Sequence, residues 1–228
     1  MMNKQLFLYQ LCDSSFPTGS FSHSYGFETY MEDGTIHDAK SFNKWLDCYL
    51  HQQLCYTDGL AICIVFKAVV AGDFTRICEI SQYLEAQCLA KETRIANQKI
   101  GQQFLTLGST LIQHEYIKTY QRLITTGELV AHPAIVFALL SYAAKATIDE
   151  TLQAFLMNNI TTLIQNAVRG VPLGQTEAQQ ILLSYQTKID GTIATIKTLP
   201  QNAFGAVAPG LEIAQMRHET LFARNFMS

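Results

Sequence analysis

Charged residues are scarce in this sequence. Of its 228 residues, 15% are charged, whereas a typical soluble domain has roughly 25%. Lysine and arginine together number 16 and aspartate and glutamate 19, so the formal net charge is −3. A charge of this size and sign gives no general attraction to phosphate, which argues against a nucleic-acid-binding protein. The hydrophobic share of 48% excludes intrinsic disorder, because disorder requires low hydrophobicity and high net charge.

Paired cysteines and membrane-length apolar runs are also missing. None of the six cysteines belongs to a C-x-x-C pair, and all lie in helix-like apolar patterns. This usage favours reduced, buried thiols in a cytoplasmic protein. The longest apolar runs, residues 60–71 and 134–144, are shorter than the ~20 residues of a membrane span, so we expect core helices there. Residues 1–12 lack a cleavage site for secretion and predict a first helix.

Familiar catalytic motifs are absent from the sequence. It contains no G-x-S-x-G elbow, no phosphate-binding loop and no dinucleotide-binding fingerprint. His218 and Glu219 do not extend to H-E-x-x-H, because position 222 is Phe. No Glu-x-x-His pair is present, which argues against a di-metal carboxylate bundle.

Helical periodicity dominates the pattern of apolar residues. Apolar side chains recur at three- and four-residue steps, each series marking one face of an amphipathic helix. Thr147 and Glu150 have the spacing of a capping box, and Pro133 after His132 can open a helix. Strand signals are scarce. The sequence therefore predicts an all-α fold, with about ten helices in a single domain of residues 1–228.

Two segments interrupt this pattern. Within residues 14–28, the stretch 20–27 alternates small polar with mostly aromatic residues, which formally suggests a strand. A lone strand would leave its backbone unpaired, so we expect instead a polar helix of small residues packed closely on a neighbour. The second segment follows Leu199, where Pro200, Gly205 and Pro209 break regular structure. We expect a short final helix over residues 211–226, within an interaction tail of residues 200–228.

Two small clusters invite a chemical interpretation. Cys48, His51 and Cys55 are spaced to share one helix face and offer ligands that suit zinc, nickel or copper. A second packed face is the more common meaning of such spacing, and a fourth ligand is not evident. The other cluster joins Asp13 to residues 22–24 and resembles a hydrolase triad. Triads are assembled from separated parts of a fold, so this interpretation is the weaker one.

Two further segments have the character of contact sites. Residues 169–175 join two periodic helices through Pro172, and Arg169 precedes the turn. Either the segment ends one helix and begins the next, or it is an exposed binding site for a partner. The tail, residues 216–226, mixes arginine with phenylalanine. Both residue types are enriched at protein interfaces, which favours a partner over simple docking on the chain's own domain.

These segments together resemble the urease accessory protein F family. Residues 14–28 (SSFPTGSFSHSYGFE) are similar to its N-terminal signature, and residues 168–176 (VRGVPLGQT) to its second, which often has Ala where this chain has Gly170. The end, from Arg217 to Ser228, is similar to its R-H-E…R-L-F-R-S pattern. Asn225 and Met227 replace the usual Leu and Arg. The three motifs occur in order and span nearly the whole chain.

The resemblance implies a cytoplasmic, all-helical scaffold without catalytic residues, metal or cofactor of its own. Such a protein binds a D-type (or H-type) urease accessory protein, recruits the G-type urease GTPase and docks on apo-urease for nickel insertion. It also implies modulation of that GTPase and a homodimer in the complex. The partner-binding residues carried over from the motifs are Ser22, His23, Ser24, Tyr25, Glu28, Arg169, Pro172, Leu173, Gln175, Arg217, His218, Glu219, Phe222, Arg224 and Phe226.

Two alternatives remain beside this expectation. One is an all-α carrier of nickel or another metal, or a small-molecule enzyme, using the two clusters above. The other is a helical adaptor unrelated to urease. Scarce charge also suggests a surface that another protein covers, with exposed apolar patches at the tail and along one broad face.

Overall fold

A computed structural model describes residues 2–228, and all the regular structure within that range is helical. This confirms the all-α prediction; Met1 lies outside the described residues. Three 3-10 turns, at residues 20–22, 201–203 and 218–220, and a π-helical stretch, Tyr49–Gly59, complete the secondary structure. The α-helices are α1 Lys4–Cys12, α2 Phe27–Glu32, α3 Ala39–Cys48, α4 Leu60–Ala71, α5 Phe74–Gln87, α6 Lys91–Leu111, α7 Glu115–Thr125, α8 Pro133–Ala143, α9 Ile148–Gly170, α10 Gln175–Thr198 and α11 Pro209–Arg217.

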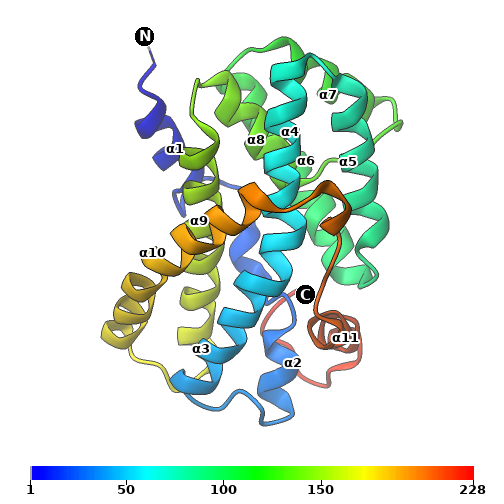
Figure 1. Ribbon diagram of the computed structural model, residues 1–228. Helices are drawn as coiled ribbons and strands as arrows, with labels where there is room; N and C mark the ends of the chain where they lie inside the picture. Colours follow the sequence, from blue (N-terminus) through cyan, green and yellow to red (C-terminus); the bar gives the residue numbers. More distant parts are fainter. Residues whose placement is uncertain (1) are drawn as a thin grey trace.

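One continuous helix, Ala39–Ala71, runs through the centre of the molecule (Figure 1). It consists of α3, a π-helical stretch Tyr49–Gly59, and α4. By length and composition it could cross a membrane, but 72% of its most apolar window is buried. Helices α5, α8, α9 and α10 all contact its α4 portion. The helix therefore forms the core of the bundle, and the prediction of core helices at residues 60–71 and 134–144 is confirmed.

Helix starts follow from local chemistry that the sequence displays. Thr147 and Glu150 form the expected capping box at the start of α9, each side chain binding the backbone of the other. His132 caps α8, where its Nδ1 accepts from the amide of Ala134 and Pro133 occupies the first helical position. Each arrangement satisfies amide groups that a helix start leaves unpaired.

The segment 14–28 forms neither the expected helix nor a strand. It makes a single 3-10 turn at residues 20–22 and then extends through His23 before α2 begins. Gly19 and Gly26 have φ of 81° and 94°, and Tyr25 also has a positive φ of 50°. A continuous right-handed helix cannot pass through these left-handed positions.

The final helix is also shorter than the expected 211–226. Helix α11 spans Pro209–Arg217, a 3-10 turn follows at residues 218–220, and residues 221–228 are irregular. This end of the chain folds back beside α2, so the C-terminus lies near the centre of Figure 1. Its backbone groups bind the first motif instead of continuing a helix, as described next.

Candidate functional site

The carboxylate of Glu28, at the start of α2, holds the end of the chain. It accepts hydrogen bonds from His218 Nε2 at 2.9 Å, from the Asn225 amide at 2.5 Å and from the Phe226 amide at 3.2 Å. Glu28 is only 3% exposed. The first and last of the three motifs are therefore joined at one buried side chain.

His218 lies between two carboxylates and is fully buried. Its Nδ1 lies 2.6 Å from Glu92 Oε2, and Arg224 donates to the other oxygen of Glu92 at 2.7 Å. Each ring nitrogen of His218 therefore has a carboxylate oxygen within hydrogen-bond distance. Two basic and two acidic side chains meet here, so each buried group has a partner of the opposite type. We call Glu28, Glu92, His218 and Arg224 the charge cluster.

The backbone of residues 22–24 pairs with the last two residues. The Met227 amide donates to the Ser22 carbonyl at 2.8 Å, and the Ser24 amide donates to Ser228 O at 2.5 Å. His23 Nδ1 lies 2.8 Å from the Ser228 hydroxyl. Its carbonyl accepts from Asn166 of α9 at 2.9 Å. The small residues of the first motif thus allow the backbone of the tail to approach closely.

Helix α11 docks on the end of the first motif and on α2 by a similar close approach. The Thr29 hydroxyl donates to the Ala214 carbonyl at 2.8 Å, and Gln215 Nε2 donates to the Tyr25 carbonyl at 3.3 Å. A Cβ on Gly26 would lie 3.0 Å from the side-chain Cγ of Gln215 and 3.2 Å from the backbone nitrogen of Gln215. With its φ of 94° as well, position 26 strongly favours glycine.

The second motif reaches the same place through Arg169 at the end of α9. Its guanidinium carbon lies 5.3 Å from the centroid of the Phe226 ring, within cation–π range. That ring also meets Phe27 edge-on at 5.3 Å and is 5% exposed. Elsewhere in the motif Leu173 is buried, whereas Pro172 and Gln175 are exposed away from these contacts.

Burial shapes the electrostatics around this junction. It lowers the pKa of His23 to about 4, and the nearby charge of His218 acts in the same direction. His23 is therefore neutral near neutral pH, and its ring binds Ser228 without carrying charge. Burial likewise raises the pKa of the Tyr25 hydroxyl, so this residue stays protonated.

The fifteen residues carried over from the motifs divide into an inner and an outer group. His23, Ser24, Glu28, Leu173, His218 and Phe226 are buried, and Ser22 and Tyr25 are partly buried. The other seven are exposed: Arg169, Pro172, Gln175, Arg217, Glu219, Phe222 and Arg224. Sequence reasoning missed Glu92 and Asn166, which lie in no motif and contact the tail and first motif from α6 and α9.

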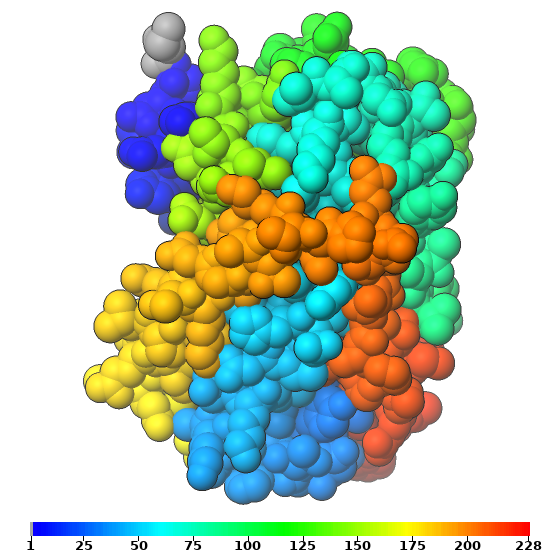
Figure 2. Space-filling model, viewed as in Figure 1, coloured from blue at the N-terminus to red at the C-terminus, as the bar shows by residue number. Residues whose placement is uncertain are grey.

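The exposed part of the tail includes four large apolar side chains. Phe222 projects completely into solvent, with 102% relative exposure, and Ile213, Met216 and Met227 are about half exposed. Figure 2 shows the end of the chain, in red, beside the medium blue of the segment that includes α2 and α3. Asn225 and Met227, which depart from the family pattern, contact the first motif through their backbone amides. We call Ile213, Met216, Phe222 and Met227 the apolar rim.

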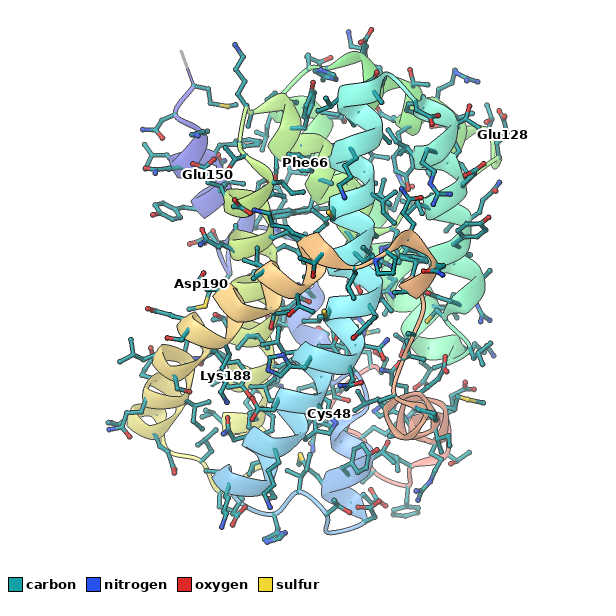
Figure 3. The ribbon with its side chains drawn as sticks, viewed as in Figure 1. Cys48, Phe66, Glu128, Glu150, Lys188 and Asp190 are labelled. Atoms are coloured by element: carbon teal, nitrogen blue, oxygen red, sulfur yellow. The ribbon has the colours of Figure 1, made fainter. Side chains whose placement is uncertain are left out.

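The proposed metal and hydrolase clusters do not assemble. Nδ1 of His51 lies 3.1 Å from the Thr192 hydroxyl, and Cys55 is buried; Cys48 lies lower on the central helix (Figure 3). Among residues 2–228 no group of three His, Cys, Asp or Glu side chains is placed to hold a metal ion. Asp13 binds Ser15, and His23 binds Ser228 instead of Ser22.

Comparison with known proteins gives a consistent result. The family model named UreF matches residues 36–186. "Urease accessory protein UreF" of Lachnoclostridium phytofermentans is 44% identical over 228 residues, covering all of both chains. The protein of the same name from Bacillus sp. (strain TB-90) is 42% identical over 227 residues, again covering both chains. That of Geobacillus kaustophilus is 42% identical over 223 residues, covering 98% of this chain and 97% of its own.

Proposed function

Because this chain belongs to the UreF family and so has a role in urease maturation, we propose that it is a scaffold for nickel insertion. In this proposal the chain binds the D-type (or H-type) accessory protein, and the pair recruits the G-type GTPase and docks on apo-urease. The chain acts in the cytoplasm, as a homodimer in the complex, and modulates the GTPase. Its contribution is binding and positioning, without a reaction of its own.

The observation that carries this proposal is the arrangement of the tail. Its buried side is locked to the first and second motifs by the charge cluster and by the Phe226 ring. Its outer side presents the apolar rim with Arg217 and Glu219 exposed beside it. Exposed aromatic and arginine side chains are typical of partner-binding sites. The buried contacts of the charge cluster and of the Phe226 ring therefore fix the position of the exposed apolar rim.

A reconstitution experiment tests the proposal. The full chain and a version lacking residues 217–228 are each mixed with the D-type protein and the GTPase, then separated by size-exclusion chromatography. The full chain should form a ternary complex and support nickel-dependent activation of apo-urease, whereas the shortened chain should do neither. Full activation of urease without this chain would refute the scaffold role. If the shortened chain still formed a stoichiometric complex, the tail would have no part in the scaffold role.

A further inference from the structure

Two exposed apolar side chains that belong to none of the three motifs lie next to the tail. Leu89, in the connection between α5 and α6, is 60% exposed, and Ile95, on the second turn of α6, is 37% exposed. Single exposed apolar side chains are common on protein surfaces and need no explanation. These two differ because polar contacts hold their segments against α11 and the tail.

Leu89 borders the first turn of α11. Its backbone amide donates to Glu212 Oε1 at 3.4 Å, and Glu212 directly precedes Ile213 of the apolar rim. The guanidinium of Arg94 donates to the Cys88 carbonyl at 2.8 Å, which holds the connection on α6. The Leu89 side chain takes no part in these bonds and stays open to solvent beside α11.

Ile95 borders the tail from α6. It follows Glu92 by one helical turn, so the two side chains share a face of the helix. Glu92 contacts His218 at 2.6 Å and Arg224 at 2.7 Å, so this face lies against the tail. At the right of Figure 2, the teal-green atoms of the segment that includes the α5–α6 connection meet the orange and red atoms of α11 and the tail. We call Leu89 and Ile95 the α6 extension of the apolar rim.

The apolar rim alone is small for a partner-binding surface. Specific protein complexes bury roughly 800 Å² on each partner, supplied by about 20–30 residues. A partner seated on the four side chains of the rim therefore covers neighbouring surface as well. The α6 extension offers such surface, because it adds exposed apolar side chains that adjoin both α11 and the tail.

Lysines flank the α6 extension. Lys91 and Lys99 lie one turn before and one turn after Ile95, and both are exposed. Within the described chain neither forms an ion pair. Lys99 is close enough to His23 for its charge to help lower the pKa of His23, which places this lysine near the end of the tail. Helix α6 exposes no acid here, since Glu92 is engaged by the tail. This margin of the surface therefore attracts carboxylates.

We propose that the D-type (or H-type) accessory protein binds the α6 extension together with the apolar rim. The partner presents one apolar strip that covers both, with carboxylates at the margin that meets Lys91 and Lys99. Leu89 and Ile95 contribute apolar contact area, and the two lysines contribute the approach and orientation of the partner. This inference rests on the proposed scaffold role and adds to it a contact outside all three motifs.

Titration calorimetry of full-length variants with the D-type protein tests this contact. We expect Leu89→Asp to raise the dissociation constant at least about tenfold, and Ile95→Asp to act in the same direction. Leu183→Asp is the matched control, because Leu183 is 65% exposed on α10, at the left of Figure 1 and away from α11. It should change the dissociation constant less than about twofold. Thermal unfolding checks that Leu89→Asp leaves the fold intact.

Two further measurements address the charge and the contact separately. Lys99→Glu should slow association with the D-type protein at least about threefold at low salt, whereas Lys118→Glu, at an exposed lysine of α7, should not. Carbene footprinting of the unmodified chain depends on no substitution. Complex formation should reduce labelling of Leu89 and Ile95 and leave the labelling of Leu183 unchanged.

The outcomes separate this contact from the scaffold role. Suppose that Leu89→Asp binds with normal affinity and that complex formation leaves the labelling of Leu89 and Ile95 unreduced, while Phe222→Ala still weakens binding. That result would overturn the α6 contact and leave the scaffold role standing. Failure of the unmodified chain to bind the D-type protein at all would overturn both.

Discussion

Glu28 and His218 are 190 residues apart in the sequence, yet their side chains meet at 2.9 Å with almost no exposure to solvent. The bond belongs to a balanced group of four charges that also fixes the backbone of residues 225 and 226. A buried ion cluster adds little net stability over apolar packing, but removing one member leaves the others uncompensated. Its contribution here is to specify one position for the tail.

Replacing His218 with alanine should therefore destabilise the chain severely. The variant leaves the carboxylates of Glu28 and Glu92 in a site with 4% and 21% exposure and no shared cation. We expect a loss of about 3–5 kcal/mol in the free energy of unfolding, measured by urea denaturation. Arg224→Ala, whose side chain is 42% exposed, should cost less than about 1 kcal/mol. Equal losses in the two variants would contradict this account.

Phe222 offers the opposite test, because it has no packing to lose. Its side chain is completely exposed, so Phe222→Ala should change the free energy of unfolding by less than about 0.5 kcal/mol. If the apolar rim binds the D-type protein, the same change should raise the dissociation constant about tenfold or more. Titration calorimetry measures the second effect and thermal unfolding the first. Unchanged affinity would exclude Phe222 as an anchor.

Arg169 should hold the end of the tail in place through the Phe226 ring, 5.3 Å away. Exposed cation–π contacts contribute about 0.5–1 kcal/mol. Arg169→Ala should thus increase hydrogen exchange of the last three amides by a factor of about two to five, since 1.36 kcal/mol is tenfold. Arg169→Lys, which keeps the cation, should have a smaller effect. Mass spectrometry of C-terminal peptides gives both values, and identical rates in all three proteins would refute the contact.

Stability should fall when the pH drops below about 6.5. Burial lowers the pKa of His23 from 6.5 to about 4, so the unfolded chain binds this proton first. The contribution is fully present above pH 6.5 and disappears as the pH approaches 4, at most about 3 kcal/mol. Urea denaturation at several pH values gives the free energy of unfolding as a function of pH. Between pH 4 and 6.5 this free energy should change less steeply with pH in His23→Gln than in the unmodified chain. An equal pH dependence in the two proteins would show that groups other than His23 determine the loss of stability at low pH.

Nickel binding by the isolated chain should not depend on Cys48. Burial raises the pKa of this thiol, and His51 is engaged by Thr192. Titration of nickel chloride into Cys48→Ala and into the unmodified chain should therefore give the same isotherm. A stoichiometric site that disappears in the variant would revive the carrier hypothesis.

Local chemistry predicted most of this fold, and long-range contacts account for what it missed. The capping box of Thr147 and the Pro133 start depend on neighbouring residues, so the sequence displays them. The alternation in residues 20–27 reflects real extended backbone at His23, whose partners are the last two residues of the chain. No local pattern could reveal that pairing. Glu92 was missed for the same reason, since its role depends on α6 lying beside the tail.

The site itself was predicted only in part. The resemblance identified Glu28, Arg169 and His218 as residues that bind partner proteins. In the structure, Glu28 and His218 instead contact each other inside the chain. Burial decides this division, and burial depends on how distant segments pack.

The union of Glu28 with His218 also has a consequence in time. At about 5–20 residues per second of synthesis, the 190 residues between them take roughly ten to forty seconds to appear. Until then the Glu28 carboxylate lacks its His218 partner, so this contact of the first motif forms only after residue 218 has been synthesised. Any product of premature termination lacks the same closure.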